Sequence, residues 1–370
     1  MSKYRKFLSL LLSLMMLVMA LPLEAITVSA ENTTEFLGGD GTEENPYLIS
    51  NKIHLNNVRN YLDAHFKMVA NIEFAEADFA DGGMFYNGGQ GWEPIGVNKE
   101  QPFVGTFNGN DHTITGLYCN RIETQYTGLF GYNKGAIRTL GLESGSVSAS
   151  DSSSGEYVYT GGIVGYNEGA ISSCYNAGSV SAPFAFSDTY AYVGGIAGRN
   201  NGTISNCYNT GNVSASTYRA YTGGITGYNS EMIGNCYNIG RVFAASVYAY
   251  AGGIAGYNSG ITKYNNTISN CYNTGSVSVS NYYSGSDFYA FTGGIVGYRD
   301  LYGVIRNCYY LNTSSKGVGS GKDTTTILTI EQMEQPSAFI GFDFDTVWEF
   351  VEENPYHSAD FAEPHLLCSG

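Results

Sequence analysis

The sequence predicts an all-β fold, a parallel β-helix (β-solenoid) of stacked short strands with a short N-terminal capping helix and an irregular C-terminal cap. The first observation behind this prediction is a phrase, clearest in Gly162–Val180, that occurs six times. Successive copies begin 29 to 41 residues apart, a period typical of solenoids and arrays. Each copy is too small and too rich in glycine to bury a core alone, so the copies must stack on one another. They begin at Gly128, Gly162, Gly195, Gly224, Gly253 and Gly294.

The second observation is that apolar residues recur at four fixed positions of the repeat. Most are β-branched or small and lie on short segments, as expected of stacked strands with one inward face. The four columns are Leu129, Ile163, Ile196, Ile225, Ile254 and Ile295; Ile137, Ile171, Ile204, Ile233, Ile268 and Ile305; Leu140, Cys174, Cys207, Cys236, Cys271 and Cys308; and Val147, Val180, Val213, Val242 and Val277.

Composition and charge argue against a disordered chain and against a nucleic-acid-binding protein. The 370 residues include 48 Gly and 31 Tyr, and only 14% are charged, which is unlike a disordered chain. With 18 Lys+Arg against 33 Asp+Glu, the net charge is −15 and no basic run is present. Such a chain repels phosphate backbones and anionic membrane surfaces, so we expect no nucleic-acid partner.

The N-terminal segment, residues 1–30, is predicted to be a cleavable signal peptide. Lys3, Arg5 and Lys6 precede an apolar run over Phe7–Leu21, and small residues at Val28-Ser29-Ala30 favour cleavage after Ala30. The alternative, an uncleaved anchor helix, would be short for a span of about 20 residues. We therefore expect a secreted or cell-surface protein without a membrane span in the mature chain.

The mature chain divides into three predicted segments: 31–125, 126–310 and 311–370. The first is the N-terminal cap with the first irregular coils; it contains an expected helix over His54–His65 and an expected strand over Phe66–Phe74. The second carries the repeats. The third is the C-terminal cap and tail, with a short helix expected over Thr329–Gln335 and an aromatic cluster that ends at Trp348.

The Cys column and two Asn columns are predicted to be structural. The five repeated cysteines should form an unpaired internal ladder, because in-register parallel strands give poor S–S torsions, although export also permits disulfides between coils. The Asn columns should stack as hydrogen-bonded ladders, with Gly165 and Gly178 and their equivalents supplying turns of positive φ. The Asn columns are Asn133, Asn167, Asn200, Asn229 and Asn258, and Asn176, Asn209, Asn238 and Asn273.

The repeats resemble the GLUG motif of bacterial surface proteins, in phrases such as Gly223–Asn229 and Asn206–Gly211. The flanks over Gly38–Ile49, Asn108–Ile114 and Phe342–Trp348 are also similar to those of such arrays. The end copies depart from the pattern, with Leu140 in place of Cys and Arg299 in place of Asn. The resemblance implies a right-handed parallel β-helix on an exported, surface-associated protein. Such arrays also accompany the peptidase of immunoglobulin-A-cleaving metalloproteases, but the family supplies no catalytic residues at these positions.

Catalytic and metal motifs are not found in the sequence, so we expect no enzyme activity and no cofactor. None of the five His forms His-Glu-x-x-His, and no CxxC pair suggests zinc. The stretch Gly317–Gly321 is the nearest to a nucleophile elbow, Gly-x-Ser-x-Gly, but its Ser comes one place too late. The rival is a carbohydrate-active β-helix, which needs two carboxylates at a defined separation. Asp111 with Glu73 or Glu93 could supply them, although Asp111 and His112 more simply hold a turn.

The candidate binding residues are tyrosines on the strand before each double glycine. Residues i and i+2 share one strand face, so the small residues between them should point inward and leave a Tyr stripe outside. The competing interpretations are that the tyrosines only stack along the solenoid, or that their face is the inner one. The candidates are Tyr157, Tyr159, Tyr190, Tyr192, Tyr221, Tyr248, Tyr250 and Tyr289; a second column, Tyr166, Tyr228, Tyr257 and Tyr298, lies beside a turn.

The function predicted from the sequence is adhesion or ligand presentation by an exported, non-catalytic repeat protein, with glycans or host and matrix proteins as partners. Two alternatives stay open at this point. The chain could be an accessory or truncated region of a larger exported enzyme, or it could be a carbohydrate-active β-helix.

Overall fold

The computed structural model describes residues 35–150, 157–183, 189–260, 267–281, 288–311, 313–351 and 363–366. The predicted signal peptide, 1–30, lies outside the described residues. Residues 36–370 form one compact unit. Within the described ranges, no helix is both long and apolar enough to cross a lipid bilayer.

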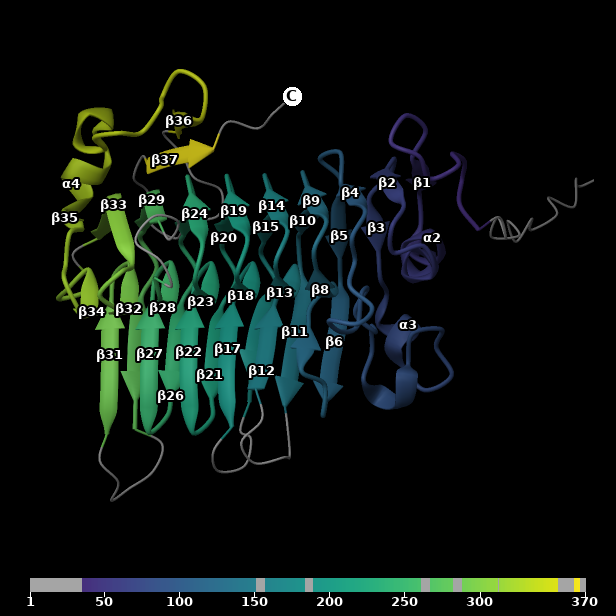
Figure 1. Cartoon of the computed structure of the whole chain (residues 1–370), viewed down its shortest axis with the longest axis horizontal. Coiled ribbons are helices and arrows are strands. Elements are labelled where there is room, and N and C mark those ends of the chain that lie inside the picture. Colours follow the sequence, from purple (N-terminus) through teal and green to yellow (C-terminus); the bar gives the residue numbers. More distant parts are fainter. Residues whose placement is uncertain are drawn as a thin grey trace, which may run out of the picture. The chain divides into compact units, whose positions relative to one another are not determined.

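One coil of the fold is built from five short strands that follow each other along the chain. In the clearest coil these are β13 (Val164–Asn167), β14 (Ala170–Ser172), β15 (Tyr175–Asn176), β16 (Ser179–Ala182) and β17 (Tyr190–Gly194). Each strand pairs in parallel with its equivalent one coil further along, with identical repeat positions in register. The coils therefore stack in sequence order, as Figure 1 shows, and the fold is the predicted parallel β-helix.

The stacked strands make four sheets, here called A to D. Sheet A contains the β14 and β15 series, sheet B the β16 series, sheet C the β13 series and sheet D the β17 series. The further strands of sheet A are β1 (Tyr47–Ile49), β2 (His65–Met68), β3 (Ile72–Glu73), β4 (Thr106–Asn108), β5 (Thr113–Thr115), β9 (Ala136–Arg138), β10 (Gly141–Leu142), β19 (Thr203–Ser205), β20 (Tyr208–Asn209), β24 (Met232–Gly234), β25 (Tyr237–Asn238), β29 (Thr267–Asn273), β33 (Val304–Leu311) and β35 (Thr326–Leu328).

The other sheets are shorter. Sheet B adds β6 (Leu117–Ile122), β11 (Gly145–Ser150), β21 (Val213–Ser216), β26 (Val242–Ala245) and β30 (Val277–Ser280). Sheet C adds β8 (Phe130–Asn133), β18 (Ala197–Asn200), β23 (Thr226–Asn229), β28 (Ala255–Asn258), β32 (Val296–Arg299) and β34 (Val318–Ser320). Sheet D adds β7 (Tyr126–Thr127), β12 (Tyr157–Gly161), β22 (Arg219–Gly223), β27 (Tyr248–Gly252) and β31 (Tyr289–Gly293).

The apolar columns fill two separate cores. The two Ile columns and the Leu140–Cys column lie in the larger core, which sheets A and C enclose. The smaller core lies between sheets B and D, where Val180 and its equivalents meet Ala191 and Val193. Members of all four predicted columns are buried in these cores, apart from Val277, which is half-buried beside the smaller one.

The predicted role of Gly165 and Gly178 is wrong. Neither has a positive φ; inside the repeats that conformation falls on Gly145, the counterpart of Gly178 in the first copy, and on the residue just before the Leu140–Cys column, which is Thr139, Ser173 or one of four Asn residues. This residue kinks the chain between the two sheet A strands of each coil. Gly165 is instead a position of close contact, because a Cβ there would lie 2.6 Å from the backbone nitrogen of Thr127. The four Asn residues are Asn206, Asn235, Asn270 and Asn307.

The N-terminal cap contains a shorter helix than predicted. Helix α2 spans Lys52–Asn57, begins at the N-cap Asn51, and continues into a 3₁₀ turn over Val58–Asn60. The predicted strand over Phe66–Phe74 divides into β2 and β3, and a further helix, α3 (Glu76–Phe79), follows. Leu55 and Val58 are fully buried against the end of the larger core, so this helix covers the stack at its N-terminal end.

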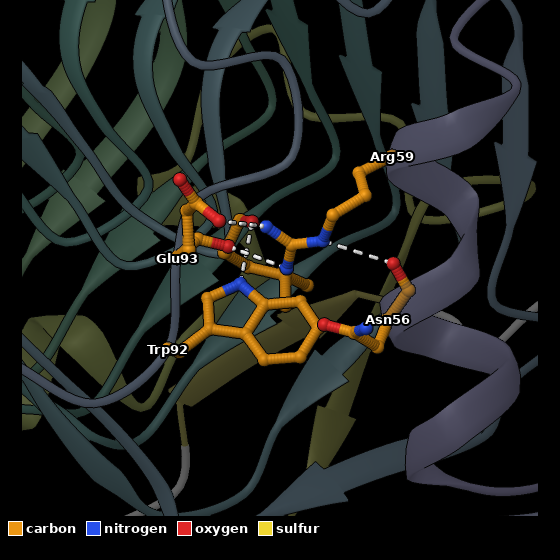
Figure 2. A network of polar contacts seen from close by, with 5 residues as sticks. Asn56, Arg59, Trp92 and Glu93 are labelled. Atoms are coloured by element: carbon orange, nitrogen blue, oxygen red, sulfur yellow. Dashed lines mark hydrogen bonds and ion pairs between the residues drawn. The ribbon is translucent and has the colours of Figure 1, made fainter. Parts of the chain in front are cut away.

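A polar network fastens this cap to the first coils (Figure 2). The Arg59 guanidinium donates to the carboxylate of Glu93 at 2.9 Å and to its backbone carbonyl at 2.8 Å, while Arg59 Nε donates to the Asn56 carbonyl. The guanidinium carbon lies 5.0 Å from the Trp92 ring centroid. Trp92 is fully buried and donates from Nε1 to the Leu129 carbonyl, so the network ties helix, loop and repeat together.

The C-terminal segment lies along the side of the stack. It contains α4 (Ile330–Met333), capped by Thr329, and the antiparallel pair β36 (Trp348–Val351) and β37 (Glu363–Leu366). Figure 1 shows this yellow segment beside the late strands of sheet A. The segment buries Tyr237, Tyr272 and Tyr309, which belong to three successive coils.

Candidate binding surface

The alternating pattern of sheet D places its tyrosines outside. The residues between them, such as Ala191 and Ala220, are fully buried and pack in the smaller core. Register between neighbouring strands is exact by repeat position, so Tyr157 pairs with Tyr190 and Tyr159 with Tyr192. The outer face of sheet D therefore carries two aromatic columns, and the interpretation that placed them inside is wrong.

The inner column is the one nearer the double glycine: Tyr126, Tyr159, Tyr192, Tyr221, Tyr250 and Phe291. Its rings stack almost parallel, with neighbouring centroids 4.7 to 5.5 Å apart. Tyr159, Tyr192 and Tyr221 are only 6%, 6% and 9% exposed. This burial raises the pKa of Tyr159 to about 12 and also raises the pKa of Tyr192 and Tyr221.

The inner column is buried because a neighbouring column on sheet C packs against it. Tyr166, for example, meets Tyr159 edge-on at 5.1 Å, and Tyr228 meets Tyr192 edge-on at 5.6 Å. Such edge-to-face contacts are favourable between aromatic rings. The candidates Tyr159, Tyr192 and Tyr221 thus take part in a stacked aromatic cluster that leaves little of them for a ligand. This sheet C column is Tyr132, Tyr166, Arg199, Tyr228, Tyr257 and Tyr298.

The outer column, two residues earlier on each strand, is Tyr157, Tyr190, Arg219, Tyr248 and Tyr289. Tyr157 and Tyr289 at its two ends are 39% and 47% exposed. The ring centroids of Tyr157 and Tyr190 lie 5.0 Å apart, and those of Tyr248 and Tyr289 lie 5.2 Å apart. Arg219 fills the position between these pairs, so this column combines stacked phenols with one cation.

The repeated cysteines are buried side by side within the larger core. All five are 0 to 1% exposed and none is in a disulfide. Each thiol lies near the carbonyl two residues earlier, as with Cys207 Sγ and Ser205 O at 3.1 Å. Burial raises the pKa of the thiols of Cys174, Cys236 and Cys271, which keeps them protonated and unreactive at neutral pH. Cys368 lies outside the described residues.

Both interior Asn columns form side-chain ladders. Asn133, Asn167, Asn200 and Asn229 each donate from Nδ2 to Oδ1 of the next member at 2.8 to 2.9 Å. The second column, from Asn176 to Asn273, repeats this pattern. The first ladder ends at Asn258, because Arg299 occupies its position in the next coil. Asn258 Nδ2 is buried there without a hydrogen-bond partner among the described residues.

Sequence reasoning missed two further ladders. One joins the kink residues Asn206, Asn235, Asn270 and Asn307 through side-chain hydrogen bonds of 3.0 to 3.2 Å. The other stacks the tyrosines after each repeated Cys at 4.8 to 5.0 Å, on the outside of sheet A. The signal for both was present in the phrase Asn-Cys-Tyr-Asn: a Tyr follows each of the five repeated Cys, and an Asn precedes four of them.

A cleft of about 560 Å³ lies where the C-terminal segment ends over this sheet A Tyr ladder. Its walls include Asp111, Tyr175, Tyr208, Asp345 and Leu366. The Tyr175 hydroxyl donates to the Glu143 carboxylate at 2.5 Å. The cleft is of the size of a small-molecule site and joins carboxylates, phenols and an apolar wall.

Of the acidic residues considered for catalysis, Glu93 has an ion-pair partner, Asp111 lies in a turn, and Glu73 is exposed at the end of β3. Glu93 is paired with Arg59, and Glu168 lies 3.6 Å from Lys134. Asp111 has a φ of 61° in a turn, and His112 Nδ1 contacts Asn71 Oδ1 at 3.0 Å. Across the described ranges, no group of three or more His, Cys, Asp or Glu side chains could hold a metal ion.

Comparison with known proteins agrees with the repeat and the fold. The GLUG motif matches residues 189–214, so the chain carries that motif, as the resemblance implied. A protein of Evansella cellulosilytica named "Putative Gly-rich membrane protein" is 39% identical over 151 residues, 40% of this chain and 16% of that protein. "Halomucin" of Haloquadratum walsbyi is 33% identical over 118 residues, 30% of this chain and 1% of its own length.

The chain thus matches only a small part of the length of these two relatives. Among solved structures, a Bacteroides ovatus protein described as a "putative immunoglobulin A1 protease" is similar with a TM-score of 0.64. The similarity covers 90% of this chain and 95% of that one at 23% identity. At this identity the similarity shows a shared fold.

Proposed function

We propose that this chain is an exported, non-catalytic repeat protein that presents the outer column of sheet D for adhesion at a cell surface or in an extracellular matrix. The observation that carries the proposal is the exposure of that column. Tyr157 and Tyr289 are 39% and 47% exposed, and neither residue belongs to the larger or the smaller core. Large amphipathic side chains held rigidly on a surface are typical of recognition sites.

Export and surface attachment are part of the same proposal. The basic and apolar character of residues 1–30 supports export. Two relatives support a place at the cell surface: one is named a membrane protein and the other is named Halomucin. The expected partners are glycans and host or matrix proteins.

The test is binding of purified residues 31–370 to an array of host and bacterial glycans and matrix proteins. A Tyr157/Tyr190/Tyr248→Ala variant should lose the binding that the unaltered chain shows, with its circular dichroism unchanged. Tyr302→Ala is the matched control, because Tyr302 is an exposed tyrosine outside sheet D, at 54% exposure. Absence of any hit, or a hit that the triple variant keeps, would contradict the proposal.

A second candidate function is an accessory region of a larger exported enzyme of the immunoglobulin-A-peptidase kind. The similarity in fold to the Bacteroides ovatus protein over 95% of its length favours it. Here the purified chain should bind immunoglobulin A1 without cleaving it. Cleavage of the heavy chain would contradict the non-catalytic role, and failure to bind would remove this candidate.

A further inference from the structure

The outer column contains one residue that is not aromatic, Arg219. It is the only charged residue in the strands of sheet D. Its guanidinium carbon lies 4.7 Å from the ring centroid of Tyr190 and 4.7 Å from that of Tyr248. Both flat faces of the guanidinium are therefore covered by phenol rings, and its N–H edges are the part left for other contacts.

Arg219 has donors without an acceptor. In the described part of the chain its guanidinium forms no hydrogen bond and no ion pair, and its Nε is buried without a partner. A guanidinium in a protein is ordinarily paired with a carboxylate or hydrogen-bonded, because an unpaired buried donor is costly. The chain holds 33 acidic residues, yet the strands of sheets C and D contain none. Among the described residues of this face, no carboxylate pairs with the Arg219 guanidinium.

A second Arg on the same face shows the contrasting case. Arg199, in the sheet C column, also stacks between two rings, Tyr166 at 5.4 Å and Tyr228 at 4.5 Å. Its Nε donates to Asn201 Oδ1 at 3.0 Å, and Asn201 in turn is bonded to the Tyr166 hydroxyl. Stacking alone thus does not prevent an Arg in this position from finding a partner, and Arg219 differs in having none.

The geometry of the stack also decides which kind of ligand the middle of the outer column can recognise. Tyr190 and Tyr248 each have one ring face against Arg219 and the other towards a neighbouring Tyr. A neutral sugar therefore finds no open ring face there on which to stack. What this part of the column offers is N–H and O–H donors, which suit a negatively charged group.

We propose that Arg219, between Tyr190 and Tyr248, is the site at which the outer column binds the carboxylate or sulfate group of an acidic glycan. The planar N–H fork of Arg binds such groups with two parallel hydrogen bonds. This inference rests on the proposed function and names its ligand class. A sugar chain fits better than an acidic peptide because the Arg219 surface offers hydroxyls rather than an apolar pocket, whereas the cleft with an apolar wall lies over sheet A.

The test uses residues 31–370 and three glycan probes: oligogalacturonate, which carries carboxylates; dextran sulfate, which carries sulfates; and neutral dextran. The decisive variant is Arg219→Tyr, which completes the aromatic column and should keep the fold. Arg241→Tyr is the matched control, because it removes the same charge from an exposed position beside Phe243. Affinities are measured at about 0.15 M ionic strength, where distant charges are screened.

We expect the unaltered chain and the Arg241→Tyr control to bind at least one acidic probe about ten-fold more tightly than dextran. Arg219→Tyr should bring that affinity down to the level of dextran without lowering the thermal midpoint. If the loss of affinity occurs with oligogalacturonate, the recognised group is a carboxylate; if it occurs with dextran sulfate, the group is a sulfate.

The outcomes that overturn the inference differ from those that overturn the proposed function. Equal binding of acidic probes by the unaltered chain and Arg219→Tyr would overturn the Arg219 site while leaving adhesion intact. Arg219-dependent binding of polyglutamate but not of the glycans would overturn the ligand class. Absence of binding to the whole glycan and matrix-protein array would overturn the proposed function itself.

Discussion

At the scale of single residues, the fold depends on side chains that meet their own copies one coil away. Asn200 shows this most clearly. Its Oδ1 accepts from Asn167, its Nδ2 donates to Asn229, both at 2.8 Å, and both atoms also bond the backbone of Gly202. Each such residue satisfies polar atoms in two neighbouring coils, so one substitution acts on both.

Asn200→Ala should lower the free energy of unfolding by about 3 kcal/mol, because it removes one hydrogen bond from Asn167, one from Asn229 and two from the backbone of Gly202. Urea unfolding followed by circular dichroism measures the loss. Asn212→Ala is the control, since Asn212 is an exposed Asn of the same repeat with no side-chain hydrogen bond among the described residues. Equal losses in the two variants would show that the ladder contributes nothing of its own.

Glycine matters in this protein mainly for close contact between coils. A Cβ at Gly195 would lie 2.3 Å from Asn209 Cγ and 2.3 Å from the carbonyl oxygen of Gly224. Gly195→Ala should therefore cost about 3 kcal/mol or prevent folding. At Gly234 the nearest atom is Ser269 Oγ at 3.8 Å, so Gly234→Ala should be tolerated. Thermal unfolding of the pair checks this, and equal midpoints would contradict it.

At the scale of the element, the alternating pattern of a strand determines which side chains point outwards, and the packing of neighbouring sheets determines how exposed those side chains are. The same alternation points two side chains of most sheet D strands outwards, and in β12, β17 and β27 both are tyrosines. The side chain of the inner column, nearer the double glycine, is buried against sheet C, whereas the side chain of the outer column stays accessible. Two residues of one strand face thus have different roles, stacking in one case and candidate binding in the other.

Buried phenols make the protein sensitive to high pH. The folded state raises the pKa of Tyr159 to about 12, whereas an unfolded Tyr titrates near about 10. The folded chain therefore holds this proton more tightly, and the stability it contributes is complete below pH ~10 and lost as the pH rises towards ~12. Tyr159→Phe should shift alkaline unfolding to higher pH, as measured by circular dichroism and phenolate absorbance. Tyr302→Phe, at an exposed site, should leave it unchanged; a shift there of the same size would refute the explanation.

At the scale of the whole molecule, the C-terminal segment holds several coils together from the side. Trp348 is fully buried and stacks on Phe342 at 4.6 Å, and Tyr272 donates to the Pro364 carbonyl at 2.5 Å. Because the segment contacts Tyr rings of three coils, it opposes fraying at the C-terminal end of the solenoid, where nearest-neighbour contacts run out.

Trp348→Ala should release this segment at a cost of about 3–5 kcal/mol. Limited proteolysis should then cut between residues 329 and 351 while the coils up to β29 persist. Ile340→Ala, at a side chain that is 74% exposed, is the control and should be cut no faster than the unaltered chain. Protection of the segment in the Trp348 variant would show that Trp348 is not what holds the segment against the coils.

The sequence by itself determined the coil, its register and the content of its cores. This was possible because stacking in register places equal repeat positions on equal faces, so repetition alone identifies the inward columns and the Asn ladders. It could not determine the extent of non-repeated parts. The helix predicted over His54–His65 ends at Asn57, and the C-terminal segment lies beside sheet A, because contacts with partners distant in sequence decide both.

Only the tertiary structure decided which tyrosines are accessible and what surrounds Arg219. A Tyr column looks the same in the sequence whether another sheet covers it or water does. The burial of Tyr192 depends on Tyr228, which belongs to a different sheet. Likewise, only the structure shows that no acceptor among the described residues is hydrogen-bonded to the Arg219 guanidinium. Local pattern sets where a side chain points, whereas the packing of distant strands sets what it meets.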